Sequence, residues 1–270
     1  MSKLAKLLQR PEPLVMGILN TTPDSFSDGG QFVDKASAEA RVKSMIEAGA
    51  EIIDIGGEST RPGATEVSVQ QELDRVLPMI ECAKQNGAIV SVDTSKSEVM
   101  QEALKLKVDL INDVRSFKAP GALEVVSSSD AHICIMHMQG EPRTMQQNPQ
   151  YDNVVTEVQE ALIKRIAECE EKGISTNRII IDPGFGFGKT LEHNCQLMKQ
   201  LESFRIIDCP LLVGVSRKTM IGQILDKDIA ERGLGSVVAA TYAALNGAKI
   251  LRVHDVEETV QAMKIMSAFQ

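Results

Sequence analysis

Eight short runs of mostly apolar residues recur along the chain, and each is followed by a segment with helical character. The runs cover residues 14–20, 50–57, 88–94, 109–114, 131–138, 178–184, 211–216 and 249–255. They are close to continuous rather than alternating, which is typical of parallel strands covered on both faces. Eight such units predict a closed (β/α)8 TIM barrel, an α/β fold in which residues 1–270 form a single domain. An open doubly wound sheet is the alternative. In the barrel, the strands at 14–20 and 249–255 must be hydrogen-bonded neighbours.

Several of the intervening segments carry signals of helix start and stop. Three starts are indicated by capping patterns: Ser68-x-x-Gln71, Asp152 and Asp255-x-x-Glu258. The first of these helices should end near Gly87 and be kinked by Pro78, and the second should stop at Gly173. No low-complexity linker or charge block divides the chain, which agrees with one domain.

Overall charge and cysteine usage narrow the class of protein. The formal net charge of −8 argues against a nucleic-acid or anionic-membrane protein, because both reward clustered Lys and Arg. The five cysteines form no C-x-x-C pair, so we expect free thiols in a reducing cytosol. The chain shows no secretory signal pattern and no run of about 18 apolar residues, and we therefore expect a cytoplasmic protein.

The stretch IIIDPGFGFGKT, at residues 179–190, superficially looks like a nucleotide-binding loop. The phosphate loop G-x-x-x-x-G-K-[ST] requires a glycine where this chain has Pro183, which has no N–H to donate to a phosphate. The dinucleotide pattern G-x-G-x-x-G fails too, since Lys189 occupies the place of its third glycine. Lys189 is therefore not predicted to bind a nucleotide.

Polar side chains stand at or just beyond the C-terminal end of every predicted strand. They are Asn20; Glu58, Thr60 and Arg61; Asp93; Asn112 and Asp113; His137; Asp182; Ser216, Arg217 and Lys218; and Arg252 with His254. One polar strand end alone is usually a helix cap, but the strand ends of a barrel converge on one face, where active sites of this fold lie.

The residue types at these ends indicate two kinds of recognition. Asp93, Asn112 and Asp182 offer amide and carboxylate groups suited to a flat heterocycle with several N–H donors. Lys218 could meet a carbonyl or ring nitrogen of that heterocycle, and Arg252 could stack on its face. A further set suits an anion bridged by a divalent cation: Asn20, Thr60, Arg61 and His254.

At this point the chain resembles the bacterial dihydropteroate synthase family. The resemblance rests on MGILNTTPDSFSDGG, IIDIGGESTRPGA, SVDTSK, INDV, MHMQGEPRTMQ, IDPGFGFGKT, VGVSRK and LRVHDV, in this order. It implies a TIM barrel, commonly a homodimer, that works in folate biosynthesis. The implied reaction joins a dihydropterin-methyl diphosphate to p-aminobenzoate and releases pyrophosphate in the presence of Mg²⁺. The implied inhibitors are sulfonamides.

The resemblance also implies roles for individual residues. Those implied to be catalytic are Asp93, Asp182, Lys218, Arg252 and His254. Those implied to bind the pterin diphosphate are Asn20, Thr60, Asp93, Asn112, Met136, Asp182, Lys218, Arg252 and His254, with Asn20 also holding Mg²⁺. Those implied to surround p-aminobenzoate are Phe26, Thr60, Arg61, Pro62, Phe187 and Ser216.

The leaving group suggests a mechanism in which a diphosphate departs from an electron-rich pterin. An SN1-like path is then favoured as a hypothesis, with Asp93 and Asp182 stabilising the cation, and ordered binding with the pterin first is expected. Two rivals stay open: a pterin-binding barrel that transfers a methyl group to a corrinoid partner, and a non-catalytic pterin-binding protein. The first should lack the long loops after the first two strands, and the second should lose Arg61, Lys218 or Arg252.

Other conspicuous residues receive ordinary structural interpretations. Cys134 and Cys209 are expected to fill the core. His132 and His193 are expected at the surface or in caps, and His137 is expected to be structural although it ends a strand.

Overall fold

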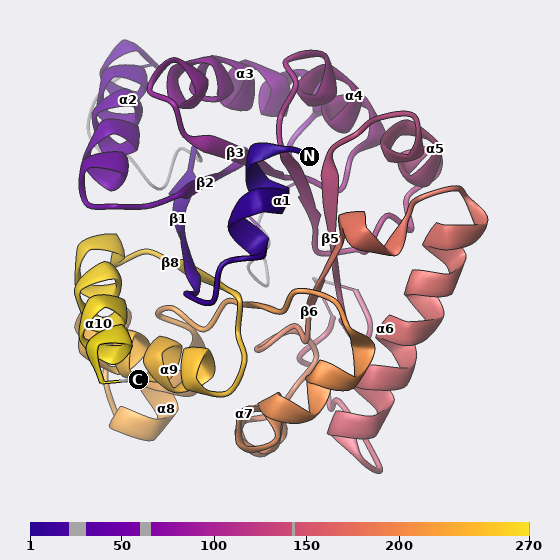
Figure 1. Ribbon diagram of the computed structural model, residues 1–270, viewed down its shortest axis with the longest axis vertical. Coiled ribbons are helices and arrows are strands. Elements are labelled where there is room, and N and C mark those ends of the chain that lie inside the picture. Colours follow the sequence, from indigo (N-terminus) through magenta and orange to yellow (C-terminus); the bar gives the residue numbers. More distant parts are fainter. Residues whose placement is uncertain (22–30, 60–65, 142–143, 270) are drawn as a thin grey trace.

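The computed structural model describes residues 1–21, 31–59, 66–141 and 144–269, without the side chains of residues 31–35 (Figure 1). Its strands are β1 (Leu14–Asn20), β2 (Ile52–Gly56), β3 (Ile89–Asp93), β4 (Leu110–Asp113), β5 (His132–Met136), β6 (Ile179–Asp182), β7 (Leu212–Val213) and β8 (Ile250–Val253). The helices are α1 (Lys3–Leu8), α2 (Gln31–Glu47), α3 (Val69–Gln85), α4 (Ser97–Lys105), α5 (Ala122–Ser127), α6 (Val154–Glu171), α7 (Leu191–Lys199), α8 (Thr219–Leu225), α9 (Gly233–Leu245) and α10 (Val256–Ala268). Short 3₁₀ turns lie at Thr176–Arg178, Leu201–Ile207 and Ile229–Glu231.

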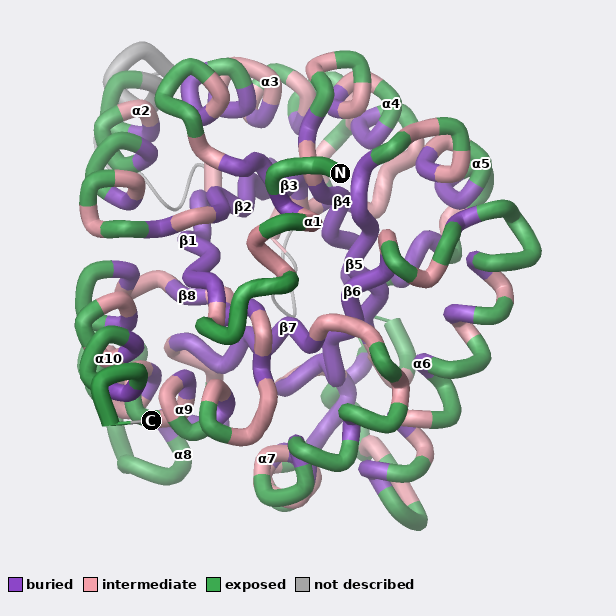
Figure 2. The backbone as a smooth tube through the Cα atoms, viewed as in Figure 1, coloured by how far each residue is buried: buried purple, intermediate pink, exposed green. Residues whose placement is uncertain are grey.

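The strands form one parallel sheet in the order β6-β5-β4-β3-β2-β1-β8-β7. The two ends of the sheet meet, which closes the barrel. Ile181 of β6 forms a parallel bridge with Leu211, and the Ile181 N–H donates to the Pro210 carbonyl at 3.0 Å. β1 pairs with β8 in the register Leu14↔Ile250, which confirms the barrel and excludes the open sheet. The helices α2 to α10 surround the strands, and burial is concentrated in the strands (Figure 2).

Alternation along each strand divides the apolar core into two parts. Residues such as Ile53, Ile55 and Ile111 face outward and pack under the helices. Their neighbours form an inner layer within the barrel, made of Leu14, Met16, Ile52, Ile89, Leu110, Cys134, Ile180, Leu212 and Ile250 together with Leu4. Leu4 belongs to α1, which lies across the N-terminal mouth of the barrel (Figure 1). This end of the barrel is therefore closed by apolar packing.

On several strands, the residue two positions after the inner apolar residue is polar, and the same period brings its side chain into the barrel interior. Asp54 follows Ile52, Asn112 follows Leu110, Asp182 follows Ile180, and Arg252 follows Ile250. The apolar layer is thus followed by a polar layer at the C-terminal end of the strands. The polar strand ends of the sequence converge there because parallel strands all end on one face.

The helix ends match the sequence in part. The Ser68–Gln71 capping box is present, α3 ends at Gln85 and continues through Pro78, and α6 ends at Glu171, before Gly173. The cap of α6 is Asn153, not Asp152, because the Asn153 side chain accepts from two N–H groups of the first turn. Asp255 precedes α10 but makes no capping hydrogen bond, since Arg217 binds its carboxylate.

The expectations for the histidines and cysteines are also confirmed only in part. Cys134 is fully buried inside the barrel, as expected, whereas Cys209 is only partly buried against the outer core. His193 completes a capping box with Thr190. The surface expectation for His132 is wrong: it is the first residue of β5 and only 4% exposed, and burial lowers its pKa.

Candidate functional site

The guanidinium of Arg252 links two carboxylates inside the barrel mouth. Its Nε lies 2.6 Å from Oδ2 of Asp54, and its Nη2 lies 2.7 Å from Oδ2 of Asp93. These residues come from β8, β2 and β3, which the order of the barrel places on one side of the mouth. Asn112 of β4 also reaches Asp54, with 3.4 Å between its Nδ2 and Oδ2. Arg252 is thereby held by two carboxylates at the floor of the site.

Asp54 was missed by the sequence analysis. It is fully buried, and the Ser91 hydroxyl donates to its second oxygen at 2.5 Å. The signal was present, because an isolated carboxylate inside the apolar run IIDIG needs a buried partner. Asp54 lies two residues before the end of β2, so it is not among the polar residues at the strand ends.

Burial shifts the proton affinity of the acidic groups at this mouth. It raises the pKa of Asp93 to about 7, an effect that Arg252 opposes and the negative charge of Asp54 reinforces. Burial also raises the pKa of Asp182, against the opposing effects of Lys218 and an N–H bond from Gly184 at 2.7 Å. A carboxyl group with the pKa of Asp93 can exchange a proton with a heterocycle near neutral pH.

Lys218 faces Asp182 from the segment after β7. Burial lowers the pKa of Lys218 to about 8, although the charge of Asp182 opposes that shift. Its Nζ donates to the Phe185 carbonyl and lies 4.6 Å from the centre of the Phe187 ring. A lysine bonded to the Phe185 carbonyl and lying over the Phe187 ring provides one wall of the site.

Ser216 and His254 join the last two strand ends. Ser216 is buried, and its Oγ lies 3.0 Å from Nδ1 of His254 and accepts the His254 backbone N–H at 3.1 Å. The next residues along the chain, Arg217 after Ser216 and Asp255 after His254, form an ion pair in which the Arg217 Nε lies 3.0 Å from the Asp255 Oδ2. The two segments that carry Ser216, Lys218 and His254 are therefore bound to each other.

Asn20 ends β1 beside the acidic side of the mouth. A Cβ built on Gly56 would lie 3.6 Å from the Asp93 Cβ and 3.9 Å from the Asn20 Oδ1, so a glycine here leaves the two side chains close. Among the residues that the structure describes, no cluster of three His, Cys, Asp or Glu is arranged to hold a metal. An amide oxygen still suits Mg²⁺, which often takes one or two protein ligands and completes its shell with water and substrate phosphates.

The remaining predicted residues fall into three groups. Met136 is buried at the end of β5, against the segment after β6, and Phe187 is partly buried beside Lys218. Asp113 does not reach the mouth, because its carboxylate accepts from Ser95 and from two backbone N–H groups of its own loop. Four predicted residues lie outside the described residues: Phe26, Thr60, Arg61 and Pro62.

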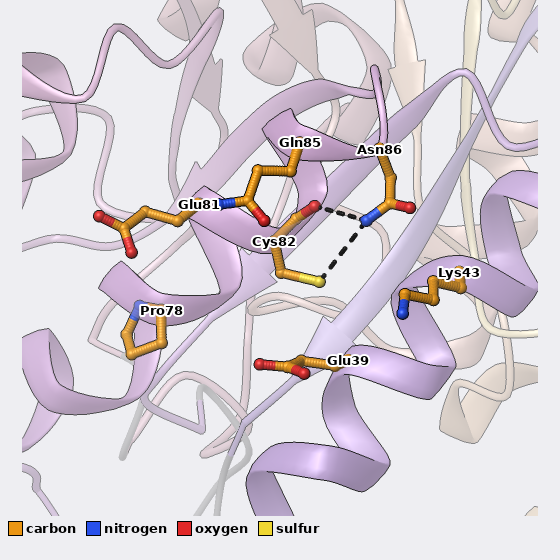
Figure 3. A pocket seen from close by; sticks show the side chains of 7 residues that line it. All are labelled: Glu39, Lys43, Pro78, Glu81, Cys82, Gln85 and Asn86. Carbon is orange, nitrogen blue, oxygen red and sulfur yellow. Dashed lines mark hydrogen bonds between the residues drawn. The ribbon is translucent and has the colours of Figure 1, made fainter.

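Two surface hollows lie outside the barrel mouth. One, between α2 and α3, is lined by Glu39, Lys43, Pro78, Glu81, Cys82, Gln85 and Asn86 (Figure 3). The other lies between α2 and α10, and its lining includes Arg217 and His254. Neither is lined by Arg252, Asp54 or Asp93. We take the barrel mouth as the candidate site because these three charged side chains are linked there. No helix among the described residues is both long and apolar enough to cross a membrane.

Comparisons with known proteins agree with this geometry. Residues 16–254 match the family described as Pterin binding enzyme. The dihydropteroate synthase of Escherichia coli is 52% identical over 262 residues, covering 97% of this chain and 93% of that protein.

Solved structures extend the likeness to three dimensions. A Yersinia pestis dihydropteroate synthase in complex with a sulfonamide drug is 50% identical, with a TM-score of 0.91 over 96% of this chain and 94% of that one. A Xanthomonas albilineans dihydropteroate synthase in complex with 7,8-dihydropteroate is 42% identical, with a TM-score of 0.88 over 97% of this chain and 95% of that one. The chain therefore belongs to the pterin binding enzymes and, within them, to the dihydropteroate synthases.

Proposed function

We propose that the protein is a transferase that condenses (7,8-dihydropterin-6-yl)methyl diphosphate with p-aminobenzoate to give 7,8-dihydropteroate and pyrophosphate. The observation that carries this proposal is the polar floor of the barrel mouth, where Arg252 joins Asp54 and Asp93 opposite Asp182 and Lys218. The relatives support it, since they are dihydropteroate synthases with complexes of a sulfonamide and of 7,8-dihydropteroate. The proposal treats residues 1–270 as one pterin-binding domain.

The floor supplies groups for both edges of a pterin. Carboxylates at Asp182 and Asp93 and the amide of Asn112 would accept the N–H groups of the ring, and the Lys218 ammonium would donate to its carbonyl or ring nitrogen. Arg252 cannot turn freely because two carboxylates hold it, so its plane would stack on the ring. Met136 would complete the apolar lining.

Departure of the diphosphate is the step that the site has to assist. Arg252 and His254, with Asn20 and Thr60, would surround the leaving group and neutralise the charge that develops on its bridging oxygen. Mg²⁺, when bound, would add positive charge at the diphosphate, with the amide oxygen of Asn20 as one protein ligand. An SN1-like path follows, because Asp93 and Asp182 would stabilise positive charge on the pterin methylene.

The second substrate needs positioning more than activation, since a neutral arylamine is already nucleophilic. Phe187 and Ser216, with Phe26, Thr60, Arg61 and Pro62, would form its site, where sulfonamides would compete. Binding is ordered, with the pterin diphosphate first. Calorimetric titration of the empty enzyme with p-aminobenzoate tests this order, and tight binding there contradicts it.

The decisive measurement is pyrophosphate release from the two substrates with Mg²⁺, in the wild type and in Lys218→Ala. Release that requires the arylamine and collapses in the variant supports the proposal. Pterin binding without turnover indicates a non-catalytic binding protein instead. Absence of pterin binding overturns the site assignment.

A homodimer and a cytoplasmic location belong to the same proposal. Exposed apolar side chains lie on α8, α9 and α10 and just after α10: Ile224, Leu225, Leu234, Val238, Tyr242, Leu245, Ile265 and Phe269. Such a face suits a second copy of the chain, and sedimentation of the wild type and Leu234→Glu tests it. None of the five cysteines forms a disulfide bond, which suits a reducing compartment.

A further inference from the structure

The turn after β6, residues 184–188, is pressed against the chain that follows β5. Its three glycines all have positive φ: 71° at Gly184, 78° at Gly186 and 61° at Gly188. A Cβ at Gly184 would lie 1.9 Å from the His137 carbonyl oxygen, and one at Gly188 would lie 2.5 Å from that of Gln139. Only glycine permits this approach, so the two segments share one packed interface.

The ammonium group of Lys189 lies inside this interface. Its Nζ donates to the carbonyls of Gly184 at 2.9 Å and Phe187 at 3.0 Å, both within the turn. On the opposite side it lies 3.3 Å from the His137 carbonyl oxygen and 3.0 Å from the His137 Nδ1. Lys189 is only 3% exposed. One side chain therefore bonds both ends of the turn and the segment against which the turn packs.

The protonation of the two partners is consistent with this arrangement. Burial and the charge of Lys189 lower the pKa of His137 to about 3, so the imidazole is neutral and its Nδ1 can accept. Burial lowers the pKa of Lys189 to about 7, with Asp182 opposing the shift and Lys218 adding to it. The carbonyl acceptors around Nζ offset part of the cost of burying the ammonium.

The outer side of the same turn faces the candidate site. Phe187 presents its ring to the Lys218 ammonium, Phe185 offers its carbonyl to that ammonium, and Gly184 donates its N–H to Asp182. The position of the Phe187 ring thus depends on a turn whose inner side is held by Lys189.

We propose that Lys189 is a positioning residue, which fixes the 184–188 turn and through it places the Phe187 ring at the p-aminobenzoate side of the site. It touches no substrate. This inference rests on the proposed function for its kinetic consequence, but its structural part can be measured without turnover.

The chain contains no tryptophan, so Phe187→Trp introduces a single fluorescent reporter into the turn. Adding Lys189→Met to this variant should shift the emission to longer wavelength and increase acrylamide quenching, because the ring loses its fixed packing. Lys199→Met, the same change on the exposed face of α7, is the matched control and should leave both unchanged. An unchanged emission in the Lys189→Met chain with native circular dichroism overturns the inference.

A milder variant keeps the test decisive if Lys189→Met does not fold. His137→Phe removes one acceptor of the lysine and keeps the lysine itself. It should shift the emission in the same direction by a smaller amount, and an unchanged spectrum overturns the inference here too.

Kinetics separate positioning from a loss of stability alone. Without the reporter, Lys189→Met should raise KM for p-aminobenzoate about tenfold and change KM for the pterin diphosphate by less than about twofold. A role in stability alone would lower the melting temperature and leave both KM values unchanged, which contradicts the inference. A wild type that releases no pyrophosphate instead rejects the proposed function and leaves the fluorescence result to decide on Lys189.

Discussion

Asp54→Asn removes one charge from the floor of the barrel while preserving the shape of the side chain. The carboxylate is fully buried, and it shares the guanidinium of Arg252 with Asp93. In the variant, the new amide cannot neutralise Arg252, and an amide N–H that faced the guanidinium would repel it. Arg252 would then be held from one side only, through Asp93.

The structure sets the size of the effect. Breaking a buried ion pair by removing one partner costs about 3–5 kcal/mol, because a charge is left uncompensated. Arg252 keeps its 2.7 Å contact with Asp93, so we expect the lower end, a loss of about 3 kcal/mol in the free energy of unfolding. Loss of the fixed Arg252 orientation should also lower kcat/KM for the pterin diphosphate about 100-fold.

Urea unfolding and pyrophosphate release measure the two effects. Asp130→Asn makes the same chemical change at an exposed position and should alter the unfolding free energy by less than about 0.5 kcal/mol. Ser91→Ala removes only one hydrogen bond to the Asp54 carboxylate and should cost about 2 kcal/mol. If Asp54→Asn unfolds like the control and keeps kcat/KM within about twofold, the ion pair does not hold Arg252 and the reasoning is wrong.

Three further predictions follow from the described contacts. Burial raises the pKa of Asp93 from 3.8 to about 7, so the protonated carboxyl contributes a stabilisation that is fully present below pH 3.8 and is lost as pH rises through 7. Urea unfolding of the wild type should therefore show a free energy of unfolding that falls with pH across this window. An equal fall in Asp93→Asn would contradict this prediction. Gly184→Ala places a Cβ 1.9 Å from the His137 carbonyl oxygen at a φ of 71°, and should destabilise by about 3 kcal/mol in urea, whereas a neutral result would mean that the turn can move away. Lys96→Met leaves the fully buried Glu72 carboxylate without its cation and should lower the free energy of unfolding by about 3 kcal/mol in thermal or urea unfolding. The Lys96→Met, Glu72→Gln double variant should regain this stability if the ion pair is responsible.

Local interactions made much of the fold readable in the sequence. The eight apolar runs coincide with the eight strands, since a strand buried on both faces must be apolar almost throughout. The Ser68 capping box and the stop before Gly173 also depend on neighbouring residues alone. The prediction of Asp152 as a helix cap was wrong for a local reason too. Asn153, one position later, competes for the same N–H groups, and its side chain is the one that accepts them.

The same distinction between local and long-range interactions applies to the candidate site. Polar strand ends were enough to locate the barrel mouth, because every parallel strand ends on that face. The partners of each polar group were not evident, since Arg252 lies 198 positions from Asp54 and 159 from Asp93. Asp255 illustrates the difference: the sequence indicates a helix cap, and the fold brings Arg217 to it instead.

The sequence by itself therefore determined the elements, the barrel and the face that carries the chemistry, because these depend on period, composition and contacts within a few residues. Only the tertiary structure decided which charges meet and where each lysine lies. Lys218 and Lys189 both follow short glycine- or serine-containing motifs, yet one lies at the mouth and the other is sealed inside a turn. Strand register and the close approach of the 184–188 turn to the chain after β5 separate them, and both arise from residues far apart in the sequence.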